Sequence, residues 1–212
     1  MARLYEWYDG PRMNLPGLDV PLGTIWCVGR NYAEHARELG SPIPAAPVIF
    51  LKPASAVLTS GGTLRLPRDS RRVDHEVELV VARAADGSLR AAVGVDFTAR
   101  DIQDELKKKG LPWTMAKGRP GFAALGPFVP ARLPAALTLS VNGVVRQRGG
   151  TADMIFPVPA LLAYLDANFG LGPGDIVFTG TPSGVGPVVP GDRVEAALGD
   201  GASRLSLTVS AA

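Results

Sequence analysis

The sequence predicts an α+β fold that is predominantly β and contains a few short helices. Three observations lead to this expectation. The 212 residues include 25 glycines and 19 prolines, about a fifth of the chain, which is typical of many turns between short strands. Short apolar runs with strand character outnumber segments with helical periodicity. Two turn sequences also have the composition of β-hairpins.

The predicted strands are apolar runs bounded by glycine, proline or polar turn residues. Asn142-Gly143 predicts a two-residue turn inside the fifth run, and the GDG sequence at 199–201 predicts a second hairpin. The runs cover residues 24–28, 47–51, 73–82, 91–97, 137–147, 175–179, 192–197 and 204–209.

Three segments are predicted to be helices. Asn31 with Glu34, and Thr98 with Asp101, have the spacing of a capping box, so each pair is expected to start a helix. Gly40 is expected to end the first helix. The predicted helices cover residues 31–40, 98–110 and 157–170.

The chain has no repeat and no clear internal linker. We expect residues 1–20 to form a short N-terminal segment or small module, and residues 21–212 to form the main domain. The N-terminus lacks the apolar stretch of a signal peptide, and no run approaches the length of a membrane span, so a cytoplasmic protein is expected. The single cysteine, Cys27, lies in a predicted buried strand and is expected to be a core thiol.

Charge and motifs exclude several classes of function. The formal net charge is +2, and the 22 Lys and Arg residues are scattered, so neither nucleic acid nor a membrane surface is an expected partner. Phosphate-binding, dinucleotide-binding and zinc-protease motifs and the nucleophile-elbow motif of serine hydrolases are missing from the sequence. Nucleotide-binding and serine-hydrolase functions are therefore disfavoured.

Two glutamates in the run DHEVELVV are unusual because the run otherwise has the composition of a strand buried on both faces. Alternation places Glu76 and Glu78 on one face, and Asp96 ends the next apolar strand before a helix. Three oxygen donors suit a hard divalent cation such as Mg²⁺ or Mn²⁺. Spacing alone leaves two alternatives open, a hydrated surface pair and a structural network of charges.

Two other groups could take part in acid-base chemistry. His35 and Glu38 are three residues apart on a predicted helix, so the carboxylate can orient the imidazole, although an ordinary surface ion pair has the same spacing. Lys117 lies in a segment rich in glycine and proline that is expected to be a loop. His75 is expected to point away from Glu76, either as a packed histidine or as a group that supports the metal ligands.

The chain resembles the fumarylacetoacetate hydrolase family. The matching stretches follow residue 22 or so in the family's order, and DELKKKGLPWTMAK is most similar to the small acylpyruvate hydrolase branch. Two departures are Asp74, where many relatives have a second histidine, and the loop after Lys117. The matching stretches are CVGRNYAEHARELG, PVIFLKPASAV, DHEVELVV, VDFTARDIQ, KKKGLPWTMAKG, VNGVVRQRGGTADMIF and GDIVFTGTPSGVGPV.

The resemblance implies a mixed β-roll with layered sheets, a homodimer, and a site built around Mg²⁺ or Mn²⁺. It implies that His35 and Glu38 form a dyad on a lid, and that Lys117 faces the substrate. The implied metal ligands are Glu76, Glu78 and Asp96, and the implied pocket residues are Arg30, Lys52, Arg100, Gln103 and Thr181.

The resemblance also implies a reaction. Hydrolytic cleavage of a carbon-carbon bond in a 2,4-dioxo acid, such as acetylpyruvate or fumarylpyruvate, would give pyruvate and a carboxylic acid. Decarboxylation of oxaloacetate, or interconversion of its keto and enol forms, is the alternative that uses the same site. A non-catalytic, metal-stabilised binding protein is a third hypothesis.

Overall fold

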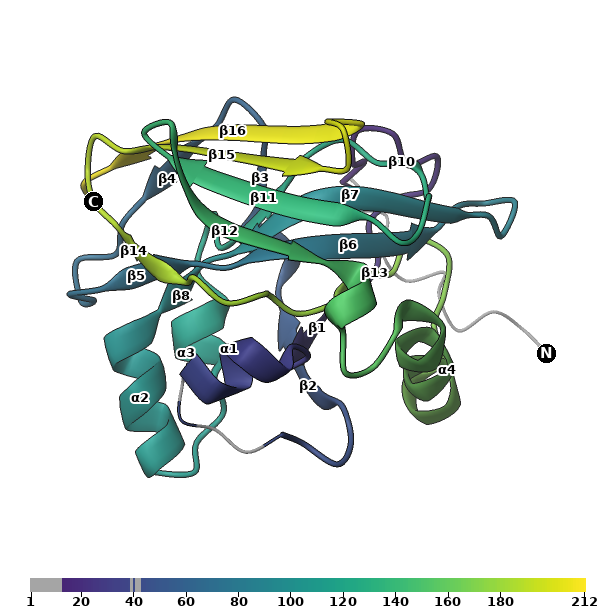
Figure 1. The fold of residues 1–212 in the computed structure, drawn as a ribbon, viewed down its shortest axis with the longest axis horizontal. Coiled ribbons are helices and arrows are strands. Elements are labelled where there is room, and N and C mark those ends of the chain that lie inside the picture. Colours follow the sequence, from purple (N-terminus) through teal and green to yellow (C-terminus); the bar gives the residue numbers. More distant parts are fainter. Residues whose placement is uncertain (1–12, 39, 41–42) are drawn as a thin grey trace.

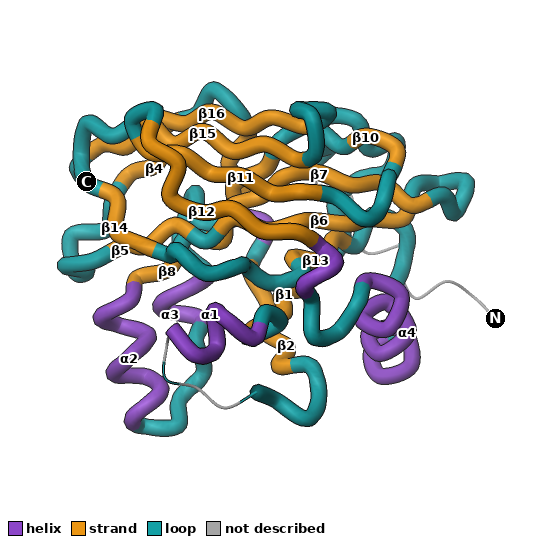
Figure 2. The backbone as a smooth tube through the Cα atoms, in the orientation of Figure 1, coloured by secondary structure: helices purple, strands orange, loops and turns teal. Residues whose placement is uncertain are grey.

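The strands form three sheets, and the helices gather on one side of them (Figures 1 and 2). The computed structural model describes residues 13–38, 40 and 43–212. The strands are β1 (Ile25–Gly29), β2 (Val48–Lys52), β3 (Val57–Thr59), β4 (Thr63–Arg65), β5 (Val73–His75), β6 (Val77–Arg83), β7 (Leu89–Asp96), β8 (Thr98–Ala99), β9 (Ala123–Leu125), β10 (Val129–Pro130), β11 (Ala136–Val141), β12 (Val144–Gly150), β13 (Ile176–Phe178), β14 (Gly186–Val188), β15 (Arg193–Leu198) and β16 (Ser203–Ser210). The α-helices are α1 (Ala33–Glu38), α2 (Arg100–Lys108), α3 (Thr114–Lys117) and α4 (Val158–Phe169).

The largest sheet is mixed and has the order β2-β1-β13-β6-β7-β9-β3, with β10 also paired to β7. A five-stranded sheet, β12-β11-β15-β16-β4, lies across the top of the view in Figure 1, and β14, β5 and β8 form a small third sheet. The main core fills the space between the two large sheets, where Val77, Leu79 and Val81 of β6 join the buried apolar residues of β11, β15 and β16. The predominantly β fold predicted from the sequence is confirmed.

The opposite face of β6 and β7 carries both the second core and the carboxylates. Val80, Ala82 and Ala92 pack there with apolar residues of β1 and β13, including Cys27. Burial raises the pKa of the Cys27 thiol well above its ordinary value, as expected of a core thiol. Glu78 has the same strand parity as Val80, so it lies on this second face, as alternation predicts.

Both predicted hairpins are present. Asn142 and Gly143 have φ angles of 53° and 77°, the left-handed backbone that a two-residue turn between β11 and β12 needs. The GDG turn joins β15 to β16. The third predicted helix also forms as α4 and ends at Gly170, which has a φ of 73°.

The predicted continuous strand 73–82 is wrong in one respect. The chain leaves the small sheet after His75 and enters the largest sheet at Val77, so Glu76 lies in a break between β5 and β6. Each half of the run is buried, so hydrophobicity alone gives no sign that the chain changes sheet between them.

The two predicted capping boxes are also wrong. Asn31 donates its side-chain amide to the carbonyl oxygens of Thr179 and Phe156, at 2.8 and 3.0 Å, and does not cap α1. Asp101 accepts hydrogen bonds from Ser70 and from the backbone N–H of Arg71, while α2 begins without a side-chain cap. Partners distant in sequence therefore replace the local bonds that the spacing predicted.

The N-terminal segment packs on the main domain where it is described. Leu15 and Leu18 are buried in the second core, and Phe128 donates its backbone N–H to the carbonyl oxygen of Pro16 at 2.7 Å. Residues 1–12 of the predicted small module lie outside the described residues. Among the residues that are described, no helix is both long enough and apolar enough to cross a membrane.

Candidate metal centre and active site

Three buried carboxylates meet at one end of the β6–β7 pair. Glu76 and Glu78 flank the start of β6, and Asp96 ends β7, because Val77 pairs with Val95 across the antiparallel ladder. The backbone N–H of Asp96 donates to the carbonyl oxygen of Glu76 at 2.8 Å, which fixes the two ends together. One carboxylate oxygen from each residue lies within 4.8 Å of the others. The proximity predicted from strand alternation is therefore present.

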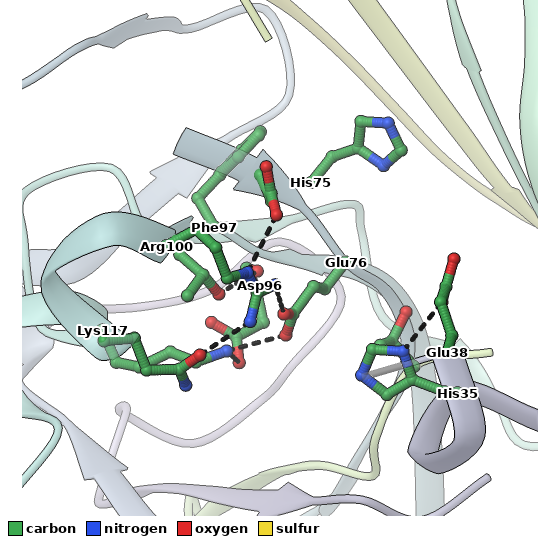
Figure 3. Close-up of polar contacts among 12 residues, drawn as sticks. His35, Glu38, His75, Glu76, Asp96, Phe97, Arg100 and Lys117 are labelled. Carbon is green, nitrogen blue, oxygen red and sulfur yellow. Dashed lines mark hydrogen bonds and ion pairs between the residues drawn. The ribbon is translucent and has the colours of Figure 1, made fainter. Parts of the chain in front are cut away.

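Two cations touch this carboxylate group from the helical side (Figure 3). Lys117 lies at the end of the four-residue helix α3, and not in the predicted loop; its Nζ is 2.7 Å from Glu76 Oε2 and 2.6 Å from Asp96 Oδ2. Arg100 contacts Glu76 through one guanidinium nitrogen and Asp74 through Nε at 2.8 Å. Asp74, the departure from the family pattern, thus holds the arginine against Glu76.

The two glutamates have opposite electrostatic environments. Burial raises the pKa of Glu76, but the charges of Lys117 and Arg100 outweigh it, and the net pKa is far below its usual range. Burial raises the pKa of Glu78 well above its usual range, and the charge of Asp96 raises it further. The site therefore favours the ionised form of Glu76 and disfavours that of Glu78.

Lys52 also contacts the carboxylate group. Its Nζ is 2.7 Å from Asp96 Oδ1 and donates to main-chain carbonyl oxygens, including that of Phe122 at 2.8 Å. Asp96 Oδ1 is buried, and its partner is this ion pair with no hydrogen bond of good geometry. Three buried carboxylate oxygens within 4.8 Å of one another fit a hard divalent cation.

His35 and Glu38 of α1 form the contact that their spacing predicts. His35 is buried, and its Nδ1 is 3.2 Å from Glu38 Oε2. Glu38 also accepts a hydrogen bond from the backbone N–H of Gly184, which ties α1 to the glycine-rich turn after β13. Burial lowers the pKa of His35 below its ordinary value, although Glu76 and Glu38 act in the opposite direction. A neutral imidazole suits a general base.

One cavity of about 30 Å³ brings most of the predicted site residues together. Lys52 is absent from its lining because it lies beneath the carboxylates, and Glu38 is absent because it stands behind His35. The predicted residues that line the cavity are Arg30, His35, Glu76, Glu78, Asp96, Arg100, Gln103, Lys117 and Thr181.

The sequence reasoning missed five residues of this lining, Val28, Gly29, Phe50, Lys107 and Trp113, of which Lys107 carries a charge. Lys107 Nζ lies 5.6 Å from the centre of the Trp113 ring. The tryptophan beside the KKK run was a signal, since an aromatic ring and a lysine often pair as cation and π system. In the glycine-rich turn after β13, the backbone N–H of Gly180 donates to Glu78 at 2.7 Å.

A curled β fold that surrounds three buried carboxylates and a histidine–glutamate pair is the architecture of an enzyme. Comparison with known proteins identifies its family. Residues 24–210 match the family described as fumarylacetoacetate (FAA) hydrolase, C-terminal. The chain belongs to the fumarylacetoacetate hydrolase family, as the sequence motifs imply. Enzymes in this family include hydrolases, isomerases and tautomerases.

Relatives and solved structures agree on the fold and differ in the activity in their names. The mitochondrial oxaloacetate tautomerase of Bos taurus is 42% identical over 201 residues, which cover 84% of this chain and 91% of the relative. A fumarylpyruvate hydrolase from Pseudomonas aeruginosa, solved with Mn²⁺ and pyruvate, is 37% identical with a TM-score of 0.85 and full coverage of both chains. A putative fumarylacetoacetate isomerase/hydrolase from Oleispira antarctica is 39% identical with a TM-score of 0.86, over 93% of this chain and 100% of that one. These matches confirm the predicted β-roll.

Proposed function

We propose that this protein is a Mg²⁺- or Mn²⁺-dependent enzyme that converts a 2-oxo acid through its enolate. The observation that carries the proposal is that the three carboxylates and the buried His35 line the same cavity. When bound to Glu76, Glu78 and Asp96, the cation would supply Lewis-acid polarisation of the 2-oxo group. The neighbouring structure with Mn²⁺ and pyruvate supports this choice of ion and substrate.

The simplest reaction that these residues support is interconversion of the keto and enol forms of oxaloacetate. His35 would take a proton from C3, and the electron pair of the broken C–H bond would form the enolate. Protonation of the enolate oxygen would then give the enol. Glu38 would keep the imidazole oriented, and the Lys117 ammonium would stabilise the oxygen that gains negative charge. The bovine relative's name supports this reaction.

Cleavage of 2,4-dioxo acids, the first expectation from the sequence resemblance, is the second candidate. His35 would take a proton from water, and the hydroxide would add to the distal carbonyl carbon. The carbon-carbon bond would then break to give a carboxylic acid and the enolate of pyruvate, which takes up a proton. Lys117 would stabilise the oxyanion of the adduct. The Pseudomonas neighbour's name supports this reaction. Decarboxylation of oxaloacetate needs the same enolate.

Cations at the cavity favour substrates with two carboxylates. Arg30 and Lys107 both line it, and neither has an ion-pair partner among the described residues. Burial lowers the pKa of Lys107, and the charges of Arg100 and Arg30 lower it further. All three cations face the cavity. We infer that this end takes a distal carboxylate, with Gln103 and Thr181 as further substrate contacts.

The proposal also includes a homodimer and movement at the site. The proposed movement is a closure of α1, which carries His35, over the bound acid. The expected cytoplasmic location stays a prediction, and the bovine relative is named as mitochondrial.

Parallel assays test the function. Purified protein with Mg²⁺ or Mn²⁺ is given oxaloacetate, fumarylpyruvate and acetylpyruvate, and we monitor keto-enol exchange, pyruvate release and loss of CO₂ separately. We expect turnover of oxaloacetate or fumarylpyruvate to exceed that of acetylpyruvate, which lacks the second carboxylate. Metal-independent turnover, or none on any of the three, would refute the proposal and favour the non-catalytic binding protein.

A further inference from the structure

Gln147 connects the carboxylate centre to Thr181 without lining the cavity itself. It belongs to β12 of the five-stranded sheet and is 1% exposed. Its Oε1 accepts hydrogen bonds from the backbone N–H of Val77 and from His75 Nδ1, each at 2.9 Å. Its Nε2 donates to Thr181 Oγ1 at 2.8 Å and to the carbonyl oxygen of Pro182 at 3.0 Å. The amide therefore uses both of its acceptor positions and both of its hydrogens.

Two of these four partners fix which way the amide points. The backbone N–H of Val77 can only donate, and the carbonyl oxygen of Pro182 can only accept. Gln147 Oε1 must therefore face Val77 and His75, and Nε2 must face Thr181 and Pro182. It follows that His75 carries its hydrogen on Nδ1, and that Thr181 Oγ1 accepts a hydrogen bond from Gln147.

The hydroxyl hydrogen of Thr181 is then held by one long bond. Thr181 Oγ1 donates to the carbonyl oxygen of Pro182 at 3.4 Å, and the same oxygen accepts the shorter bond from Gln147. Since Thr181 lines the cavity, its hydrogen can be donated to an oxygen of a bound acid. Gln147 also accepts a hydrogen bond from Val77, the first residue after Glu76. One amide therefore fixes the backbone next to a proposed metal ligand and sets the direction in which the Thr181 hydroxyl donates.

We propose that Gln147 is a positioning residue that commits the Thr181 hydroxyl to donate toward the substrate. This inference rests on the proposed function, because it assumes that Thr181 contacts a bound acid. If Gln147 only held two sheets together, ligand affinity would not depend on the direction of the Thr181 hydroxyl or on the tautomer of His75.

The proton positions are tested without any substrate. The chain has two histidines, so nitrogen-15 NMR of histidine-labelled protein shows only two imidazole rings, and His75→Phe identifies the second. At a pH where the ring is neutral, we expect His75 to carry its hydrogen on Nδ1. In Gln147→Met, where the acceptor is lost, that tautomer should no longer be the sole form. A hydrogen on Nε2 in the unmodified protein would overturn the inference.

The effect on ligand is tested by calorimetry with oxalate, a mimic of the pyruvate enolate, and Mn²⁺-loaded protein. Gln147→Met and Thr181→Val should each weaken oxalate about tenfold, the value of one hydrogen bond, and together should weaken it no further. Additive losses, or unchanged affinity in Gln147→Met, would contradict the inference. Val145→Thr, an exposed position on the same strand, is the matched control.

Two further measurements separate the possible failures. If Gln147→Met does not fold, Gln147→Glu takes its place in the calorimetry. An ionised glutamate still accepts hydrogen bonds from Val77 and His75, but it has no hydrogen to donate to Thr181. The measurement is made above the pKa of the new carboxyl group. In Gln147→Glu an unchanged oxalate affinity would also contradict the inference. If oxalate does not bind the unmodified protein, the proposed function fails, and the NMR result still decides the proton positions.

Discussion

At the scale of single residues, two glutamates of the site differ in which charged groups surround them. Glu76 and Glu78 are two positions apart, yet the first contacts Lys117 and Arg100 while the second receives only the N–H of Gly180. In a buried environment, one added cation shifts a carboxyl pKa in the direction opposite to desolvation. Lys117 therefore supplies the counter-charge that a divalent ion would otherwise provide at Glu76 and Asp96.

The activity should depend on pH through His35. A base works only in its unprotonated form, so kcat/KM should rise with pH through the pKa of His35, which lies below about 6.5 because burial disfavours the imidazolium. Glu38→Gln keeps an acceptor for Nδ1–H but removes a charge that favours the imidazolium, so the acid limb should move to lower pH.

Steady-state kinetics from about pH 4.5 to pH 8 check this expectation. His35→Ala should lose roughly 10² to 10⁴ in kcat with Mn²⁺ affinity unchanged. Glu105→Gln, an exposed carboxylate of α2, is the control and should keep the profile of the unmodified protein. An acid limb that moves upward in Glu38→Gln would show that His35 is not the base.

The sequence predicts the carboxylate trio and the His35–Glu38 contact because both depend on spacing within one strand, one hairpin or one helical turn. Gln147 lay beyond that reasoning. Its partners Val77 and Thr181 are far away in sequence, and Gln147 reaches them from a different sheet. Period and propensity carry no information about such distant pairs.

At the scale of elements, the β6–β7 pair determines whether the ligands face one another. Gly94 lies directly opposite Glu78 in this ladder. A Cβ at Gly94 would lie 2.5 Å from a methyl carbon of Val80 and 2.7 Å from a ring carbon of Phe178. Contacts this short require neighbouring core side chains to shift, so the absence of a side chain at this position lets the sheet pack next to the three carboxylates.

Gly94→Ala should therefore destabilise the protein by about 1 to 3 kcal/mol, the usual cost of overpacking a core. Urea unfolding followed by circular dichroism measures the free energy of unfolding. Gly172→Ala is the matched control, because a Cβ there meets only a carboxylate oxygen of Asp175 at 3.9 Å. Equal stability of the two variants would contradict the packing argument.

Element starts were less predictable than element types. The segment after Asn31 forms a helix as expected, but the asparagine side chain bonds to Thr179 and Phe156 because those carbonyl oxygens are buried and need a donor. The break at Glu76 has a similar origin, since β5 pairs with β14 and β8 in another sheet. Capping and periodicity rules consider only hydrogen bonds within one segment, whereas in the folded chain a side chain can also bond to segments that are distant in sequence.

At the scale of the whole molecule, one apolar face supports the proposed homodimer. Edge strand β2 and α3 border a groove of about 460 Å³, and Leu51, Leu111 and Phe169 line it while about half exposed. Exposed apolar side chains that gather in this way are typical of protein–protein contacts.

Light scattering coupled to size-exclusion chromatography should give about 44 kDa, twice the 22.2 kDa of one chain. Leu51→Lys combined with Leu111→Lys should halve that mass, because a lysine ammonium is costly to bury without a partner. Val144→Lys, at the exposed tip of the β11–β12 hairpin, should leave the dimer intact. A monomer in the unmodified protein would contradict the proposal.

Metal binding should stabilise the whole fold by linkage. At a Mn²⁺ concentration of about 100 times Kd, the native state gains about 2.7 kcal/mol, which corresponds to a rise in Tm of roughly 5 to 10 °C. Glu78→Gln retains an acceptor for the Gly180 N–H but removes a ligand charge, so most of the rise should disappear. Differential scanning calorimetry measures both. Glu195→Gln, on the five-stranded sheet, should respond to Mn²⁺ as the unmodified protein does.

The break at Glu76 and the end of β7 place all three proposed ligands within 21 residues of sequence, from 76 to 96, whereas the proposed base comes from α1 and the distal cations from other segments. One pair of strands therefore carries every proposed ligand, whereas the proposed base and the distal cations come from separate elements. A substitution at a distal cation can change the substrate contacts and leave the ligand set in place. Proteins similar to this chain carry the names tautomerase, hydrolase and isomerase.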